Sequence, residues 1–291
     1  MENQNISNTK VSASIVTYQN NIDILRSTLA SVQGADMAVD LFVIDNSPTT
    51  ELQGLCEEFN ASYFHNPQNP GFGASHNLAV FELTEPNIHL IINPDITFDG
   101  NTISQLVGFM NDHPEVACLV PKVVYPDGSL QRLCKLLPSP INLFSRRFAS
   151  ALAERLDEDY ELRWFGYDQI VDIPYVSGCF MAVRTEVFRK IGGFDQRFFM
   201  YLEDTDLSRR LAQHGRVVFY PDAVVKHTFA KQSYKNRRLL FAHIKSAIQY
   251  FNKWGWFFDS ERHHRNREAV AKIRAAMLKT KQDNHSTELN T

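Results

Sequence analysis

Short apolar runs alternate with helical patterns through the first 125 residues of the chain. Runs rich in Val, Ile and Leu that end at turn residues predict buried β-strands. Between them, apolar positions three or four residues apart predict helices, as at Leu25, Leu29 and Val32, where Asn21 can cap the helix and Gly34 can close it. The predicted strands are residues 12–18, 40–45, 61–64, 89–92 and 116–120, and further helices are predicted near residues 51–60, 74–81 and 102–112.

This alternation predicts an α/β fold with a mostly parallel central sheet that is flanked by helices. In open sheets of this kind, ligands bind in the crevice beyond the carboxyl ends of the strands. Tyr18, Asp45 and Asp95 each stand at such an end. We therefore expect three separate segments of the sequence to meet at one crevice.

The second half of the chain begins with residues 133–172, in which prolines, arginines and acids are mixed with weak periodicity. We interpret this segment as a connection or flap with some helix. Residues 178–211 then predict a strand, a short helix that ends at Gly192-Gly193, an aromatic run and a second helix that opens with acids. Further strands are predicted at residues 216–220 and 224–229.

Residues 237–258 predict an amphipathic helix that combines basic residues with aromatic and aliphatic ones. Two interpretations of this helix stay open with equal weight. It is either an interfacial helix that lies on an anionic membrane or an ordinary helix whose apolar face packs on the core. Residues 259–291 are polar and predict a further helix that frays toward the end of the chain.

Composition narrows the class of protein. The chain has 291 residues, of which 44% are hydrophobic and 22% charged, with a formal net charge of −3, so nucleic acid is not an expected partner. The four cysteines show no ligand spacing and are expected to be reduced thiols. Residues 1–10 lack an apolar signal region, and no apolar run approaches the ~20 residues that span a bilayer. We expect a cytoplasmic protein, with peripheral contact at the inner face of the cytoplasmic membrane if residues 237–258 form an interfacial helix.

Asp95 is a candidate metal ligand because of where it stands. It follows an apolar strand and Pro94, which lacks the N–H that a sheet ladder needs, so the strand should stop there. A lone carboxylate at the edge of a sheet suits a hard divalent cation that also holds a diphosphate. The alternative is that Asn93-Pro94-Asp95 is only a turn.

Three acids, Glu203, Asp204 and Asp206, directly follow an aromatic run at residues 198–201. Acids in the first turn of a helix complement its dipole, which explains Asp206 well. Glu203 or Asp204 is instead a candidate general base that faces a hydroxyl group. The helix N-terminus would lower the pKa of that carboxyl group, whereas desolvation by the aromatic residues would raise it.

His227 lies in a β-like run and is either a structural histidine or a metal ligand. As a ligand it would offer a neutral imidazole, which fits Mn²⁺ better than Mg²⁺. The loop Gly71-Phe72-Gly73-Ala74-Ser75 has no GxGxxG pattern and no Walker lysine, so no phosphate-binding motif is assigned to it.

Several of these segments together resemble an inverting glycosyltransferase of family 2 with the GT-A fold. The resemblance covers roughly residues 11–230 and is most specific at residues 192–207, GGFDQRFFMYLEDTDL. Within the family, the chain is most similar to bacterial rhamnosyltransferases that build lipopolysaccharide, O-antigen or related surface polysaccharides. The resemblance to family 2 is also carried by residues 14–20 (SIVTYQN), 43–47 (VIDNS), 69–77 (NPGFGASHN) and 93–95 (NPD).

The resemblance implies a role for each matching residue. Asp204 would be the catalytic base with Glu203 beside it, and a divalent cation, Mg²⁺ or Mn²⁺, would be bound by Asp95 and His227. The nucleotide would be held by Thr17, Tyr18, Asp45 and Asn93, the donor sugar would be bordered by Asn77 and Gly178, and the acceptor side would be shaped by Phe198, Phe199 and Tyr201.

The resemblance also implies a division of the chain and a reaction. Residues 1–232 would form the GT-A domain, with a nucleotide-sugar half at about 11–125 and an acceptor half at about 173–232, and residues 233–291 a C-terminal helical extension. Asn93 replaces the first acid of the family's D-x-D motif, a change that favours dTDP-L-rhamnose as donor. The acceptor would be a saccharide or a lipid-linked saccharide. The alternatives are a UDP-sugar donor, or a protein that binds sugar nucleotides without catalysis.

Overall fold

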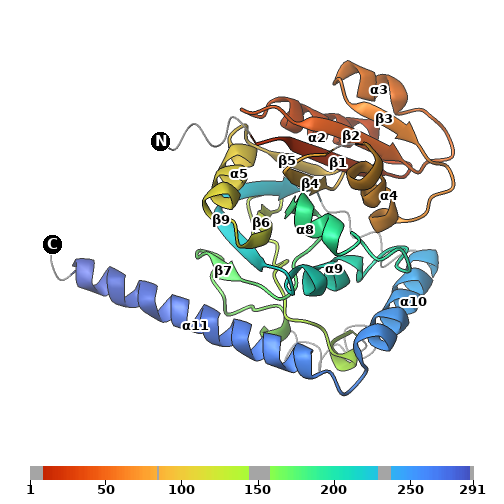
Figure 1. Cartoon of the computed structure of the whole chain (residues 1–291). Helices are drawn as coiled ribbons and strands as arrows, with labels where there is room; N and C mark the ends of the chain where they lie inside the picture. Colours follow the sequence, from red (N-terminus) through yellow and green to blue (C-terminus); the bar gives the residue numbers. More distant parts are fainter. Residues whose placement is uncertain (1–8, 84, 144–157, 229–236, 289–291) are drawn as a thin grey trace.

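The computed structural model describes residues 9–83, 85–143, 158–228 and 237–288. Within these residues one mixed sheet of nine strands has the order β3-β2-β1-β4-β8-β6-β9-β5, with β7 paired to β9. Strands β8, β5 and β7 run against the other six, which are parallel to one another. Helices flank this sheet (Figure 1), so the predicted α/β fold is confirmed.

All five strands predicted in the first half are present. Strands β1, β2 and β4 are buried along nearly their whole length, which explains their continuous apolar sequences. The strands are β1 (Val11–Thr17), β2 (Asp40–Asp45), β3 (Ser62–His65), β4 (Ile88–Ile92), β5 (Ile96–Phe98), β6 (Val116–Val124), β7 (Val171–Asp172), β8 (Phe180–Arg184) and β9 (Arg216–His227).

The helices cover both faces of the sheet. The side chain of Asn21 accepts hydrogen bonds from the N–H groups of Asp23 and Ile24, so it caps the first helix as predicted. One face is covered by α2, α3 and α5, and the other by α8 and α9. The helices are α2 (Ile22–Gln33), α3 (Gln53–Glu58), α4 (Phe72–Leu78) with a π-helical turn at Ala79–Leu83, α5 (Thr102–Asp112), α8 (Thr185–Lys190), α9 (Glu203–Leu211), α10 (Arg237–Trp254) and α11 (Ser260–Glu288).

The strand order reverses at β1. Strands β2 and β3 lie to one side of it and β4 to the other, so a ligand-binding crevice is expected beyond the carboxyl ends of β1 and β4. Thr17 ends β1, Asp45 ends β2 and Asn93 follows β4. The fold therefore brings the predicted nucleotide-binding segments to one edge of the sheet.

Strand β9 differs from the prediction, because the two runs at 216–220 and 224–229 form one strand. The register against β6 skips from Tyr220 to Val224, so Pro221 falls in a bulge where its missing N–H breaks no ladder. Beyond the bulge β9 also pairs with β5, a three-residue strand too short to be recognised in the sequence, and Ile96 lies opposite His227. This pairing carries His227 to Asp95.

The described part of the segment at 133–172 is packed rather than loose, so its interpretation as a flap is wrong there. Phe165 and Tyr167 are almost fully buried and their rings lie 5.8 and 5.1 Å from the ring of Phe219 in β9. Its aromatic residues are too far apart for a periodic pattern, yet they complete the core on that face of the sheet. Residues 144–157 of the segment lie outside the described residues.

Two helices at the end of the chain are held to the rest of the fold by a buried arginine of α9. Arg209 is fully buried and forms two hydrogen bonds to Asp259, of 2.8 and 3.0 Å, and one of 2.8 Å to Glu261. Its guanidinium lies 4.0 Å from the centre of the Trp254 ring. Burial alone would lower the pKa of Arg209, but these acids more than offset it and the pKa is raised.

Asp206 provides a second connection from α9 to α10. It is fully buried and accepts hydrogen bonds from Trp254 Nε1 at 2.8 Å and Arg210 Nε at 2.7 Å, while Lys253 Nζ lies 2.6 Å away. Asp206 was expected only to complement the dipole of α9, but it also binds side chains of α9 and α10. Among the described helices, none is both long and apolar enough to cross a bilayer. The predicted domain boundary at 232/233 falls outside the described residues.

The Arg209 network predicts a large effect of one substitution. Arg209→Ala should lower the free energy of unfolding by about 3–5 kcal/mol, because it removes two charged hydrogen bonds from the buried carboxylate of Asp259 and leaves it only the weaker contacts of Arg262. Urea unfolding followed by circular dichroism measures this. The control is Arg26→Ala, which removes an exposed pair with Glu58 and should cost about 1 kcal/mol or less. Equal losses in the two variants would contradict the assignment.

Candidate active site

The ends of β1 and β2 carry a cluster of hydrogen-bonded polar side chains. Asp45 is fully buried, and its carboxylate accepts hydrogen bonds from Thr17 Oγ1 at 2.9 Å, Tyr63 OH at 2.8 Å and the Ser47 N–H at 3.0 Å. These donors compensate a charge that would otherwise be costly to bury. Tyr18 is 51% exposed directly after β1 and offers an aromatic face. The structure thus gathers three of the predicted nucleotide-binding residues, and adds Tyr63, which no motif had singled out.

Asp95 and His227 meet at the far end of the same edge. His227 Nε2 lies 3.2 Å from Asp95 Oδ1, and the N–H of Thr228 donates to the main-chain oxygen of Asp95 at 2.9 Å. The Asp95 side chain is 23% exposed and that of His227 only 6%. The two side chains therefore offer an oxygen and a nitrogen to one partly open point.

Gln131 fixes the orientation of His227. Gln131 Nε2 donates to the main-chain oxygen of His227 at 2.8 Å, and Gln131 Oε1 lies 3.0 Å from His227 Nδ1. Because that amide oxygen can only accept, Nδ1 is the donor in this contact, and Nε2 is the nitrogen that faces Asp95. Gln131 is itself 4% exposed. The sequence offered no signal for it, since it lies outside every motif.

The donor set fits a divalent cation that is completed by a ligand. One carboxylate oxygen and one neutral imidazole nitrogen suit Mn²⁺ well. Among the residues that the structure describes, no three His, Cys, Asp or Glu side chains gather into a metal site. Two protein ligands leave room for the oxygens of a diphosphate, as hard cations at phosphate sites commonly require.

The residues just before β8 join the Asp95 segment to Asp204. The N–H of Asn93 donates to the main-chain oxygen of Cys179 at 2.9 Å, and the N–H of Gly178 donates to Asp204 Oδ2 at 3.1 Å. Burial raises the pKa of the Cys179 thiol to about 12, and the charges of Asp95 and Asp204 raise it as well. The segment with the predicted metal ligand and the predicted base are thus linked through the adjacent residues Gly178 and Cys179.

Asp204 is a partly buried carboxylate at the start of α9. Besides Gly178 it accepts a hydrogen bond of 2.7 Å from the N–H of Thr205, and the hydroxyl of Tyr175 lies 3.4 Å away. Burial raises its pKa, while these N–H groups and the charge of Lys135 oppose the rise. Tyr175 and Lys135 were not identified from the sequence, because neither lies in a recognisable motif.

Glu203 differs from Asp204 although the two are adjacent. It is 7% exposed, and its Oε2 has no hydrogen-bond partner within the described structure. Burial, followed by the charge of Asp204, raises the pKa of Glu203 well above its usual value. Both causes favour the protonated form of Glu203, so Asp204 is the better candidate for a base.

The aromatic run before α9 is clamped from two sides. Phe199 O accepts a hydrogen bond of 3.0 Å from the N–H of Phe72, and Met200 O accepts one of 2.8 Å from Ser246 Oγ in α10. Tyr201 and Leu202 adopt left-handed backbone angles, with φ of 70° and 63°. Such conformations persist only where surrounding contacts enforce them, and they gather at functional sites.

The predicted acceptor-side residues have different surroundings. Phe198 is fully buried against Leu202 and α10, so its side chain holds the helix and does not reach an open surface. Phe199 is 38% exposed, and the ring of Tyr201 lies 5.0 Å from that of His243. A role in shaping the acceptor side stays a prediction for Phe199 and Tyr201, and for Phe198 it would be indirect.

Asn77 and Gly178 occupy positions that the structure explains by packing. The amide of Asn77 exchanges two hydrogen bonds of 2.8 Å with the backbone of Phe194, next to the left-handed Gly193. A β-carbon added at Gly178 would lie 3.3 Å from the β-carbon of Asp204, so a larger residue would press on the carboxylate. That these two residues border a donor sugar stays a prediction.

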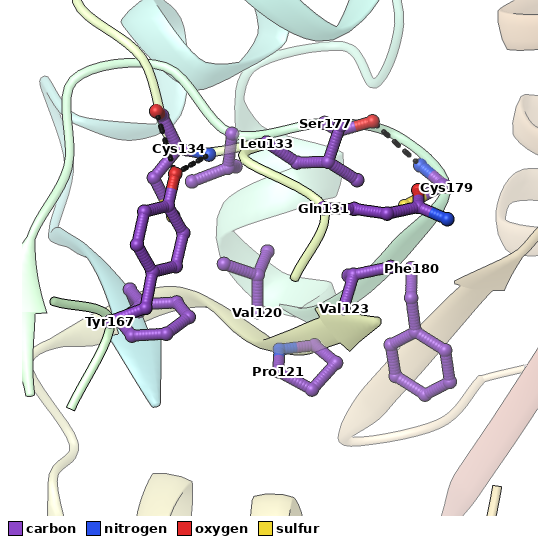
Figure 2. Close-up of a pocket in the computed structure, with 12 residues that line it drawn as sticks. Val120, Pro121, Val123, Gln131, Leu133, Cys134, Tyr167, Ser177, Cys179 and Phe180 are labelled. Carbon is purple, nitrogen blue, oxygen red and sulfur yellow. Dashed lines mark hydrogen bonds between the residues drawn. The ribbon is translucent and has the colours of Figure 1, made fainter. Parts of the chain in front are cut away.

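A small apolar pocket lies behind the site. Its volume of about 10 Å³ holds roughly one water molecule. Figure 2 shows Gln131, Ser177 and Cys179 along one side of it, where the hydroxyl of Ser177 accepts from the N–H of Cys179 at 3.4 Å. This interior is too small for a sugar or a nucleotide. It backs the residues that hold His227 and Asp204.

Comparison with known proteins gives relatives along most of the chain. The N-acetylglucosaminyl-diphospho-decaprenol L-rhamnosyltransferase of Mycobacterium tuberculosis is 26% identical over 260 residues, which cover 80% of each chain. Rhamnosyltransferase WbbL of Escherichia coli K12 is 23% identical over 252 residues, 81% of this chain and 90% of the relative.

Solved structures share the fold at low sequence identity. Mannosyltransferase PcManGT from Pyrobaculum calidifontis, in complex with GDP-Man and Mn²⁺, superposes with a TM-score of 0.56 and 17% identity over 94% of this chain and 75% of that one. GalNAc-T7 with UDP, GalNAc and Mn²⁺ gives 0.56 and 16%, over 75% of this chain and 43% of that one. These are GT-A glycosyltransferases.

Two family profiles match the sequence. Residues 167–233 match the profile described as the N-terminal domain of galactosyltransferase. Residues 12–192, well over half of the chain, match glycosyl transferase family 2. The protein is therefore a glycosyltransferase that belongs to family 2 and has the GT-A fold.

Proposed function

We propose that the protein transfers L-rhamnose from dTDP-L-rhamnose, with inversion, to a saccharide acceptor during synthesis of a cell-surface polysaccharide. The observation that supports the proposal is the connection through Gly178 and Cys179. The N–H of Gly178 binds the carboxylate of Asp204, and the carbonyl of Cys179 binds the N–H of Asn93, two residues before Asp95, which pairs with His227. Two relatives that cover four fifths of the chain are rhamnosyltransferases. The Asn93-Pro94-Asp95 turn favours the same donor.

The acceptor of the proposed reaction is a saccharide carried on a lipid. The name of the mycobacterial relative includes a decaprenyl diphosphate, which supports this acceptor class. The proposed place of action is the cytoplasm, because the four cysteines are all buried free thiols, as expected in a reducing compartment.

Asp204 acts as the general base in this proposal. Its carboxylate takes the proton of the acceptor hydroxyl as that oxygen attacks the anomeric carbon opposite the nucleotide, and the bond to the diphosphate breaks. One displacement inverts the configuration, so a β-L-rhamnosyl donor yields an α-L-rhamnoside. Burial strengthens Asp204 as a base because it raises the pKa of the carboxyl group toward the working pH. The proton then leaves to solvent.

The other residues bind and orient. Asp45, Thr17 and Tyr18 hold the base and ribose, and Asn93 offers its amide to the ribose. Asp95 and His227 are the residues that would hold a divalent cation, whose charge offsets the negative charge gained by the leaving diphosphate. Two of the solved GT-A structures contain Mn²⁺, which supports this choice of cofactor.

Substituting the proposed base should remove turnover without removing the donor. Asp204→Asn should lower kcat about 10²–10⁴-fold, because an amide cannot take the proton. In the wild type, kcat should also fall on the acid side with a midpoint above the usual carboxylate range of about 4. Steady-state kinetics measure both effects, and isothermal titration with dTDP checks that the nucleotide still binds.

Asp222→Asn is the matched control, since Asp222 is an exposed acid on β9 and should leave kcat unchanged. Near-normal kcat in Asp204→Asn would refute the assignment of the base.

The donor is tested with a panel of nucleotide sugars. dTDP-L-rhamnose should give the largest rise in Tm and the only product with a suitable acceptor, when compared with UDP-galactose, UDP-N-acetylglucosamine and UDP-galactofuranose. The galactosyltransferase profile at residues 167–233 makes UDP-galactose the most informative competitor. Preference for a UDP-sugar would replace the rhamnose assignment, and nucleotide binding without transfer to any acceptor would favour a non-catalytic protein.

Gln131 should control metal affinity through His227. Gln131→Leu removes the hydrogen bonds that orient the imidazole and should weaken Mn²⁺ binding about 10–100-fold. Electron paramagnetic resonance of free Mn²⁺ measures this without any turnover. Gln53→Leu, at an exposed glutamine of α3, should bind Mn²⁺ like the wild type. Unchanged affinity in Gln131→Leu would show that His227 does not bind the metal or needs no such support.

A further inference from the structure

Helix α10 has two apolar faces, and only one of them is buried against the described part of the chain. Ala247, Tyr250 and Phe251 are buried against Phe198 and Leu202, next to the aromatic run. This contact shows that the helix packs on the core, which was one of the two interpretations open from the sequence. It does not explain the residues on the opposite side of the helix.

The outer face of α10 consists of Phe241, Ile244 and Ile248, which are 70%, 37% and 42% exposed. Their spacing of three and four residues places them in one stripe along the helix. Just past the end of α10, Phe257 and Phe258 are 72% and 99% exposed. Clusters of exposed large apolar side chains of this kind mark interaction sites.

The positive charge around α10 favours an anionic partner. The sequence between Asp222 and Asp259 contains no Asp or Glu, although the whole chain is slightly acidic. Arg238 and Lys245 are exposed and, by their helical spacing, border one side of the apolar stripe. A basic helix with an apolar stripe fits the boundary of an anionic bilayer. A second copy of the same face would instead place like charges opposite each other in a symmetric dimer. The basic residues in this stretch are Lys226, Lys231, Lys235, Arg237, Arg238, Lys245 and Lys253.

The inner face of the same helix touches the site. Ser246 donates to Met200 O at 2.8 Å, and the ring of His243 lies 5.0 Å from that of Tyr201. Lys253 and Trp254 bind Asp206, two residues after Asp204. Figure 1 shows α10 beside α9 at the margin of the molecule, with the turn to α11 at its lower end. A partner that binds the outer face of α10 would therefore lie on the same helix that contacts Met200 and Tyr201.

We propose that the outer face of α10, together with Phe257 and Phe258, docks the protein on an anionic lipid bilayer and so presents Asp204 to an acceptor carried by a membrane lipid. The presence of a lipid-linked acceptor rests on the proposed function, whereas the docking on the bilayer does not. The helix lies in the interface, because the described helices include none that could span the bilayer.

Vesicle co-sedimentation of the full chain tests the docking. The wild-type protein should bind vesicles of phosphatidylglycerol and phosphatidylcholine, bind vesicles of phosphatidylcholine alone at least tenfold more weakly, and lose affinity as salt is raised. The double variant Phe241→Glu with Ile248→Glu should lose at least tenfold in affinity for the anionic vesicles. Arg238→Gln and Lys245→Gln should each lose about fivefold.

The control is Ile170→Glu with Leu278→Glu, which places the same two charges at positions that are 44% and 64% exposed, outside the acid-free stretch. It should sediment like the wild type. Circular dichroism and dTDP titration verify that each variant is folded with an intact nucleotide site.

Two results would overturn the proposal. One is wild-type protein that fails to bind anionic vesicles, or binds them as well after the Phe241/Ile248 substitutions as before. The other is a wild-type dimer that becomes a monomer on substitution without any vesicle binding, since a second copy would then cover the face. Because sedimentation uses neither donor nor acceptor, it can succeed while rhamnosyl transfer fails, and the two proposals are judged separately.

Discussion

Two hydrogen bonds made by neighbouring residues organise the site. The N–H of Gly178 binds the carboxylate of Asp204, and the carbonyl of Cys179 binds the N–H of Asn93. Through them the start of α9 and the turn after β4, which are more than a hundred residues apart in sequence, face the same crevice. The absence of a side chain at Gly178 allows this approach, because a β-carbon there would lie 3.3 Å from that of Asp204. Without this connection, the proposed base and the proposed metal ligands would be separate features of one sheet.

Helix α9 connects the chemistry to the C-terminal helices. Its first turn carries Asp204 toward the crevice, while Asp206 and Arg209 are buried on the side that holds α10 and α11. Tyr201 and Leu202, whose backbone angles are left-handed, directly precede α9 and join it to the aromatic run. Their conformation is enforced by packing on α10, since Leu202 is 7% exposed there. The proposed membrane contact and the proposed base are therefore two ends of one packed unit.

Local pattern sufficed for much of this structure. The strand ends at Asp45 and Ile92 and the Asn21 cap follow from short-range rules that the fold obeys, and the first strand ends within one residue of the predicted Tyr18. The approach of His227 to Asp95 does not, because it depends on the bulge in β9 and on β5, which has only three residues. Gln131 and Lys135 act through contacts across long sequence separations. Phe198 is buried because α10 packs on it, whereas Phe199 stays partly exposed. The sequence of the aromatic run contains no signal that separates these two residues.

The central claim is that the Asp95–His227 pair and Asp204 serve one ligand. A crystal structure of the protein with dTDP-L-rhamnose and Mn²⁺ tests it most directly. We expect Mn²⁺ on Asp95 and His227 with the diphosphate bound to it, the base near Asp45, and the anomeric carbon of the sugar facing the side of the crevice where Asp204 lies. A nucleotide bound elsewhere, or a sugar with Asp204 turned away from its anomeric carbon, would contradict the account.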